Sequence, residues 1–135
     1  MASHPTPDAP LRTRALDHVV LVVRDVEASL TWYHEHLGLP VEGLEAFRDG
    51  SKPFASLRVD EGTILDLQPG VPEGRTVDHL AFVVDEDVDA VAASGRFEVL
   101  GGPRELSGAR GVGRGIYVRD PDGHRIELRN YPPAG

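Results

Sequence analysis

Alternating hydrophobic and polar positions predict several β-strands, and two of these strands begin with nearly the same residues. Residues 16–23 read LDHVVLVV and residues 77–84 read VDHLAFVV. Both segments are rich in β-branched residues, as half-buried strands are. Further along, residues 63–67 (TILDL) resemble residues 124–128 (HRIEL). The members of both pairs lie 61 residues apart, which predicts two copies of one structural unit.

Each copy is expected to form one strand, one helix and three further strands. In the first copy, residues 17–23 form the opening strand, Asp25 is an N-cap for the helix and Gly38 ends it. The remaining strands of this copy are expected at 41–47, 54–60 and 63–68. The second copy is expected to contain a strand at 77–84, a helix at 87–94, strands at 96–101, 114–119 and 124–130, and a turn at 120–123.

These elements place the chain in the α+β fold class, as two tandem βαβββ modules at residues 16–70 and 76–131. The modules are expected to make one domain, because 135 residues, 40% hydrophobic and 27% charged, suit a single globular unit. The proline-containing segment 1–15 and the segment 132–135 are expected to be flexible tails.

Composition excludes several classes of function. The chain has no cysteine, which excludes disulfides, thiolate metal sites and cysteine nucleophiles. Its net charge of -8 argues against binding to nucleic acid or anionic membranes. The longest apolar run, Val19–Val23, is far shorter than the ~20 residues of a membrane-spanning helix. Without an apolar signal segment at the N-terminus, the protein is expected in the cytoplasm.

Side-chain alternation places four polar residues of the repeat on one face of the predicted strands. His18 and His79 lie on the opening strands, and Asp66 and Glu127 lie between apolar residues on the closing strands. If the two copies pair by pseudo-twofold symmetry, these four side chains converge on one point.

The doubled βαβββ plan, the dipeptides Asp17-His18 and Asp78-His79, and the ending 120–128 (DPDGHRIEL) resemble the vicinal oxygen chelate superfamily. This superfamily includes glyoxalase I, extradiol dioxygenases, methylmalonyl-CoA epimerase, fosfomycin-resistance proteins and bleomycin-binding proteins. The resemblance covers residues 16–131 and implies a curved mixed β-sheet around a metal-binding cavity. It is closest to the small, single-domain glyoxalase-like members.

The resemblance implies that His18, His79 and Glu127 bind a divalent metal ion, with Asp66 as a fourth ligand. Two imidazoles and one or two carboxylates suit Zn, Ni, Co, Mn or Fe. Asp66 is one methylene shorter than the glutamate of glyoxalase-type members, so its carboxylate can fall short of the metal. In that case a two-histidine, one-carboxylate triad remains, as in Fe(II) oxygenases, and Asp66 becomes a candidate general base.

The implied function is that of a metal-dependent glyoxalase-like lyase or isomerase. It would chelate a small oxygenated metabolite through two oxygens, with Asp66 or Glu127 moving a proton. The alternatives are an extradiol ring-cleaving dioxygenase, a fosfomycin-type epoxide-opening enzyme and a non-catalytic drug-binding protein. Relatives of this size generally form homodimers, so a homodimer is also implied.

Three further residues are candidates for substrate binding. Tyr117 and Arg119 alternate onto one face of a predicted strand, and Arg129 is placed to orient an anionic substrate. The glycine-rich segment 105–114 is expected to form a flexible lid over the cavity, with Arg110 and Arg114 available for anion contacts. Tyr131 is expected to help close the pocket.

Overall fold

A computed structural model describes residues 9–119 and 124–133. The turn expected at 120–123 and most of the predicted tails lie outside the described residues. The described elements are, in chain order, β1 (Thr13–Val23), α1 (Val26–Leu37), β2 (Val41–Glu42), α2 (Leu44–Arg48), β3 (Ala55–Asp60), β4 (Thr63–Pro69), β5 (Val77–Val84), α3 (Val88–Ala93), β6 (Val99–Gly108), β7 (Gly111–Arg119) and β8 (Arg125–Asn130). None of the helices in the described ranges has the length and apolar character needed to cross a membrane.

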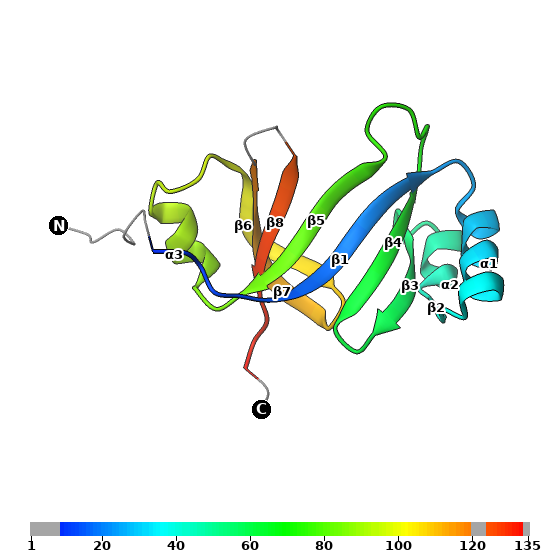
Figure 1. Cartoon of the computed structure of the whole chain (residues 1–135), viewed down its shortest axis with the longest axis horizontal. Helices are drawn as coiled ribbons and strands as arrows, with labels where there is room; N and C mark the ends of the chain where they lie inside the picture. The colour runs from blue at the N-terminus through cyan, green and yellow to red at the C-terminus, as the bar shows by residue number, and fades with distance from the viewer. Residues whose placement is uncertain (1–8, 120–123, 134–135) are drawn as a thin grey trace.

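The strands form one eight-stranded mixed sheet in the order β2-β3-β4-β1-β5-β8-β7-β6. Figure 1 shows this curved sheet with α1 near one end and α3 near the other. At the centre, β1 runs parallel to β4 and antiparallel to β5, and β5 runs parallel to β8. Val20 lies opposite Asp66, and Ala81, 61 positions after Val20, lies opposite Glu127. The α+β class and the two βαβββ modules are therefore confirmed.

Each module has its own apolar core, which lies between the outer face of its strands and helix α1 in the first module or helix α3 in the second. In the first module, Val26 and Leu30 of α1 pack with Leu57 and Leu67 of the sheet. The helix begins where predicted, because the Asp25 carboxylate accepts a hydrogen bond from the Ala28 amide. In the second module, the core under α3 contains Val84, Val88, Val91, Ile116, Val118 and Leu128.

The strand predicted at 41–47 is wrong beyond Glu42, because residues 44–48 form helix α2. Gly43 adopts the left-handed conformation, with φ of 76°, and separates the short strand β2 from the helix. Leu44 and Phe47 then lie three positions apart and both contact the core under α1. In a helix this spacing puts both side chains on one face, whereas in a strand they would point to opposite faces, so packing both on one core requires the helix.

Strand β1 begins at Thr13, inside the segment predicted as an N-terminal tail. Its early part pairs with β5, with Thr13 opposite Val84 and Ala15 opposite Val83. Two ion pairs hold this extension: Arg12 contacts Glu86, and Arg14 contacts Asp85. Residues 13–15 of the predicted tail therefore belong to the sheet.

The glycine-rich segment 105–114 is not a loop, because it forms most of the hairpin between β6 and β7. Its glycines provide space for buried side chains. A Cβ atom at Gly108 would overlap the Arg129 guanidinium and the Tyr131 hydroxyl, and one at Gly113 would overlap the Asn130 carbonyl oxygen. The expectation of a flexible lid fails because close packing, and not flexibility, accounts for these glycines.

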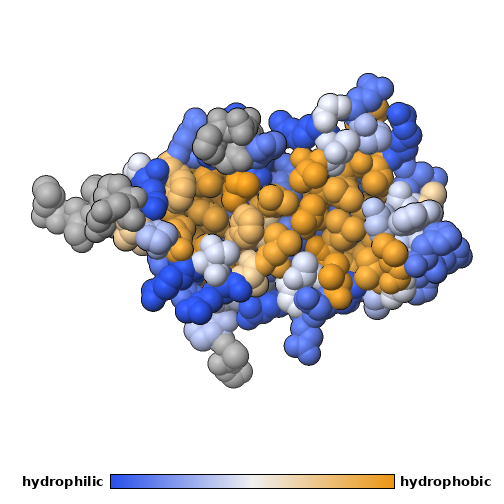
Figure 2. Space-filling model, viewed as in Figure 1, coloured by the Kyte–Doolittle hydropathy of each residue, from blue (hydrophilic) through white to orange (hydrophobic). Residues whose placement is uncertain are grey.

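The outer face of the central strands carries a hydrophobic band between the two described cores. Leu65 packs at the edge of the core under α1, and Ile126 packs at the edge of the core under α3. Figure 2 shows hydrophobic side chains over β4, β1, β5 and β8. The strand register aligns four aliphatic residues across them in one row, and each is only partly buried: Leu65, Val19, Leu80 and Ile126. Because successive side chains alternate between faces, this row lies on the face opposite His18, His79 and Glu127.

Candidate metal centre

Three side chains from three neighbouring strands meet at the centre of the concave face. His18 from β1 and His79 from β5 bring their Nε2 atoms to 3.0 Å from each other. Each Nε2 lies 3.3 Å from Oε1 of Glu127 on β8. Among the described residues, these three form a group whose ligand atoms all lie within 4.8 Å of one another.

The register of the central strands produces this convergence. Val20 lies opposite His79 on β5, and Ala81 lies opposite both His18 on β1 and Glu127 on β8. The three side chains therefore project from adjacent strands to one face of the sheet. His18 and Glu127 are buried, and the His79 side chain is 11% exposed.

The aspartate before each histidine orients its ring. Nδ1 of His18 lies 2.7 Å from Oδ2 of Asp17, and Nδ1 of His79 lies 2.8 Å from Oδ2 of Asp78. A carboxylate at Nδ1 favours the tautomer whose Nε2 is free to bind a metal. Sequence reasoning did not single out these aspartates, although the repeated Asp-His dipeptide was a signal for them.

The pKa values of His18 and Glu127 depend on burial and on their hydrogen-bond partners. Burial alone lowers the pKa of His18, but hydrogen bonds to Asp17 and Glu127 outweigh burial and raise it to about 9. Burial alone raises the pKa of Glu127, but its bonds to His18 and His79 and the nearby Arg129 charge hold it well below the usual range. Glu127 is therefore a carboxylate, in contact with both imidazoles and with Arg129.

This donor set fits a divalent transition metal. Ligands at about 2.1 Å from a metal lie about 3.0 Å apart in octahedral and about 3.4 Å apart in tetrahedral geometry. The observed separations of 3.0 and 3.3 Å fall in this range. Two imidazole nitrogens and one carboxylate oxygen suit Zn, Mn, Fe, Co and Ni alike, so the residues do not distinguish among these metals.

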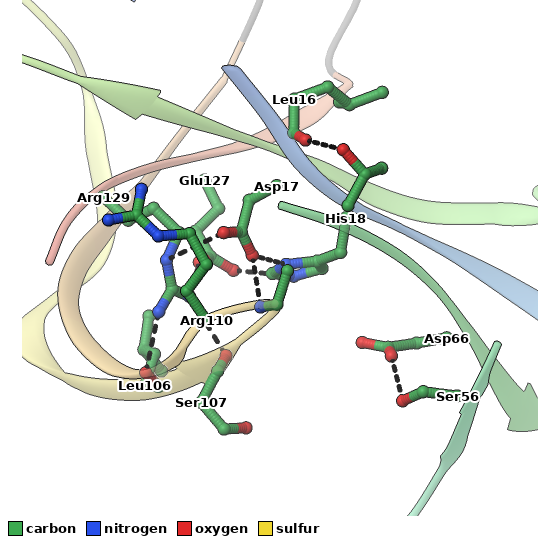
Figure 3. Close-up of polar contacts among 12 residues, drawn as sticks. Leu16, Asp17, His18, Ser56, Asp66, Leu106, Ser107, Arg110, Glu127 and Arg129 are labelled. Carbon is green, nitrogen blue, oxygen red and sulfur yellow. Dashed lines mark hydrogen bonds and ion pairs between the residues drawn. The ribbon is translucent and has the colours of Figure 1, made fainter. Parts of the chain in front are cut away.

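Arg129 contacts the Glu127 carboxylate on the side away from the two histidines. Its Nη1 donates to Oε2 of Glu127 at 2.6 Å and to the Ser107 carbonyl at 3.0 Å, and its Nη2 donates to the Leu106 carbonyl at 3.0 Å (Figure 3). The side chain is fully buried. The structure thus places Arg129 behind a candidate ligand, in contrast to the substrate contact expected from the sequence, because the β6–β7 hairpin covers its guanidinium.

The same hairpin also holds Asp17, the residue that orients His18. The Asp17 carboxylate accepts hydrogen bonds from the Ala109 amide, at 2.9 Å, and from the Tyr131 hydroxyl. The Arg110 amide in turn donates to the Tyr131 oxygen at 3.1 Å. Tyr131 therefore supports Asp17 on the buried side of the candidate metal centre. The sequence had instead led us to expect that it closes the pocket.

Asp66 does not join the three converging groups. Its Oδ1 accepts a hydrogen bond of 2.6 Å from the Ser56 hydroxyl, and Figure 3 shows this pair apart from His18 and Glu127. Burial raises the pKa of Asp66, and the Ser56 hydrogen bond and the two histidine charges oppose the rise only in part. Asp66 lines a cavity of about 90 Å³ with residues that include Glu42, Lys52, Phe54, Ser56 and Arg58.

Tyr117 and Arg119 occupy different surroundings. The Tyr117 ring meets the His79 ring edge-on, with centroids 5.5 Å apart, so Tyr117 adjoins the candidate metal centre. The Arg119 guanidinium lies 3.7 Å from the Glu98 carboxylate and lines an apolar groove with Leu11, Phe97 and Val118. The structure brings Tyr117 to the three converging groups and leaves Arg119 at the end of β7.

The arginines of the glycine-rich segment have partners within the fold. Arg114 makes two hydrogen bonds to the Asp89 carboxylate of α3, at 2.7 and 2.9 Å. The Arg110 guanidinium lies 4.6 Å from the centroid of the Tyr131 ring. Both side chains support the hairpin in the positions described.

Comparisons with known proteins agree with this geometry. Among curated proteins, the chain is 31% identical over 131 residues to the glyoxalase domain-containing protein RDO1 of Mycosarcoma maydis, covering 92% of this chain and 72% of the relative. It is 31% identical over 124 residues to the glutathione transferase FosA of Serratia marcescens, covering 85% of this chain and 79% of the relative.

Among solved structures, methylmalonyl-CoA epimerase from Mycobacterium tuberculosis superimposes with a TM-score of 0.67 at 25% identity, covering 90% of each chain. A family model described as Glyoxalase/Bleomycin resistance protein/Dioxygenase superfamily matches residues 15–128, which include the first module, nearly all of the second and all three converging side chains. The chain therefore belongs to the Glyoxalase/Bleomycin resistance protein/Dioxygenase superfamily.

Proposed function

We propose that this protein is a divalent-metal-dependent enzyme of the glyoxalase type, a lyase or isomerase for a small oxygenated metabolite. The observation that carries the proposal is the buried triangle of His18 Nε2, His79 Nε2 and Glu127 Oε1. Its edges suit one cation, and aspartates orient both rings. A purely structural cluster would not need two imidazoles aimed at one carboxylate oxygen.

His18, His79 and Glu127 would hold the metal, which when bound would supply Lewis-acid stabilisation for negative charge on substrate oxygens. Asp66 is the better candidate to move a proton. Its carboxylate keeps an oxygen beyond the one bonded to Ser56, and its raised pKa favours proton exchange. Glu127 is a weak base by comparison, because Arg129 and the histidines stabilise its charged form.

Two other reactions keep the same metal ligands. The similarity to the glutathione transferase FosA supports a fosfomycin-type enzyme that opens an epoxide. The position of Asp66 outside the triangle supports a ring-cleaving dioxygenase, because two histidines and one carboxylate form the usual triad of non-haem Fe(II) oxygenases. Oxygen uptake with catechols by Fe(II)-loaded protein tests the dioxygenase, and no uptake excludes it for those substrates.

Metal analysis tests whether His18, His79 and Glu127 bind a metal ion, which all of these reactions require. The wild-type protein, purified without chelator and dialysed against Mn(II) or Zn(II), is expected to retain about one equivalent of metal. His79→Ala should lose most of it, because one of three ligands is absent. His34→Ala is the matched control, since His34 lies exposed on α1 and its Nδ1 contacts the Leu39 carbonyl. Equal metal content in all three proteins would contradict the assignment.

We also propose that the protein is a homodimer formed through the hydrophobic band on the outer face. Val19 and Leu80, and likewise Leu65 and Ile126, are 61 positions apart, so the band repeats the pseudo-twofold symmetry of the modules. A face with this symmetry can match the same face of a second copy. The band consists of aliphatic residues, so two copies can meet there without bringing like charges together, although the net charge of the chain is -8.

A further inference from the structure

Two arginines lie against the Tyr117 ring on the concave face of the second module. The Arg125 guanidinium is 5.1 Å from the ring centroid, and the Arg104 guanidinium is 5.6 Å from it. Arg104 lies opposite Gly115 on β7, two positions before Tyr117, and Arg125 lies two positions before Glu127. Strand alternation therefore puts both arginines on the face that carries the metal ligands.

The electrostatic surroundings leave these guanidinium groups available to a ligand. In the described ranges no carboxylate lies within ion-pair distance of Arg104. Arg125 has one such neighbour, Asp78, at 3.7 Å, and that same carboxylate oxygen is 2.8 Å from Nδ1 of His79. Both arginines are exposed. A guanidinium has five N–H donors, and most of those of Arg104 and Arg125 have no partner among residues 9–119 and 124–133.

Tyr117 connects this pair to the metal ligands. Its ring meets His79 edge-on, and Tyr117 lies directly opposite Glu127 in the pairing of β7 with β8. The cation–π contacts with the ring hold the two guanidinium groups beside it, and guanidinium donors suit planar or tetrahedral oxyanions. The two positive charges also stand out in a chain whose net charge of -8 repels anions elsewhere.

We propose that Arg104 and Arg125, positioned by Tyr117, form an oxyanion subsite beside the metal centre, and that the substrate carries a carboxylate or a phosphate-type group. The proposal rests on the proposed function, because it assigns one end of that enzyme's substrate. The oxyanion would lie on the second-module side of the metal ligands. Asp66, on β4 of the first module, would face the part of the substrate that exchanges a proton.

An NMR titration with methylphosphonate and acetate tests the subsite in Zn(II)-loaded and metal-free protein. We expect methylphosphonate, acetate or both to bind the zinc-loaded wild type and to shift the amide signals of residues 104 and 125. Arg104→Gln and Arg125→Gln should each weaken that binding about tenfold, since each removes charge-assisted hydrogen bonds. Tyr117→Phe should retain most of the binding, because the ring remains.

Arg24→Gln is the matched control, because Arg24 is also exposed but lies beside Trp32 of α1. Binding by both subsite variants that is no weaker than in this control would overturn the proposal, even with zinc bound normally. Failure of the wild type to bind zinc would instead contradict the proposed function. The metal-free titration then decides: shifts at residues 104 and 125 support the subsite, and their absence overturns it. The tighter probe identifies the type of oxyanion.

Discussion

At the scale of single residues, Asp66 and Glu127 occupy equivalent positions of the two modules but have opposite acidities. Both are buried, and both lie on the closing strand of their module. Glu127 contacts two imidazoles and Arg129, which together lower its pKa, whereas the direct partner of Asp66 is the Ser56 hydroxyl, and its pKa is raised. Equivalent positions in a duplicated fold can therefore provide a candidate metal ligand in one module and a candidate base in the other.

The raised pKa of Asp66 makes a prediction about stability. A carboxyl group with a higher pKa in the folded chain than in the unfolded chain weakens folding as the pH rises through that interval. Asp66→Asn removes the buried charge and is therefore expected to stabilise the metal-free protein at pH 7, by on the order of 1 kcal/mol. Below the unfolded pKa, where the aspartic acid is neutral in both states, this gain should be lost.

Urea unfolding of both proteins at pH 7 and at successively lower pH measures this difference. Asp60→Asn is a useful control, because Asp60 is exposed at the end of β3. A stability gain that does not change with pH would mean that burial of the Asp66 charge is not its cause.

At the scale of elements, the β6–β7 hairpin is the main structural difference between the modules. Its carbonyls accept hydrogen bonds from Arg129, and its Ala109 amide donates to Asp17. The position equivalent to Arg129 in the first module is Gln68, and the position equivalent to Tyr131 is Gly70. The hairpin therefore supports His18 and Glu127 from one side and leaves His79 and Asp78 more exposed.

Gly113→Ala should disrupt this hairpin. The added methyl group would overlap the Asn130 carbonyl on the neighbouring strand β8, so the two strands must shift. Overpacking of this kind typically costs about 1–3 kcal/mol, and urea unfolding measures it. Gly62→Ala is the matched control, because its nearest neighbour would be a side-chain oxygen 4.0 Å away. Equal stability of the two variants would contradict the role given to Gly113.

At the scale of the whole molecule, the pseudo-twofold axis between β1 and β5 organises both faces of the sheet. The concave face carries the candidate ligands, and the outer face carries the hydrophobic row of Leu65, Val19, Leu80 and Ile126. The helices cover the outer face only toward its two ends (Figure 1), so the centre stays open. Exposed apolar areas of this kind mark interaction surfaces.

Sedimentation velocity tests the proposed dimer. The wild-type protein is expected to sediment as a dimer, and Val19→Asp and Leu80→Asp as monomers, because a carboxylate in an apolar interface loses its hydration. Val112→Asp is the matched control, since Val112 is 58% exposed on β7 and lies outside the band. Circular dichroism confirms that each variant is folded. A monomeric wild type, or folded band variants that remain dimeric, would contradict the interface.

The sequence by itself determined the parts of this protein that depend on local periodicity and on the repeat. Residue alternation predicted the strands, and the Asp25 and Gly38 signals predicted α1. The shared offset predicted that His18, Asp66, His79 and Glu127 would meet, and the structure brings three of these four together. All of these follow from the two-residue period of a strand and from symmetry, and both can be read along one chain.

Tertiary structure alone decided which polar side chains reach the centre and which support it. Asp66 bonds to Ser56 on the neighbouring strand, and Arg129 is buried because a hairpin folds over it. Residues 44–48 form a helix because Leu44 and Phe47 then both pack against the core under α1. Each outcome depends on contacts between segments distant in sequence and on side-chain reach, which no pattern along the chain records.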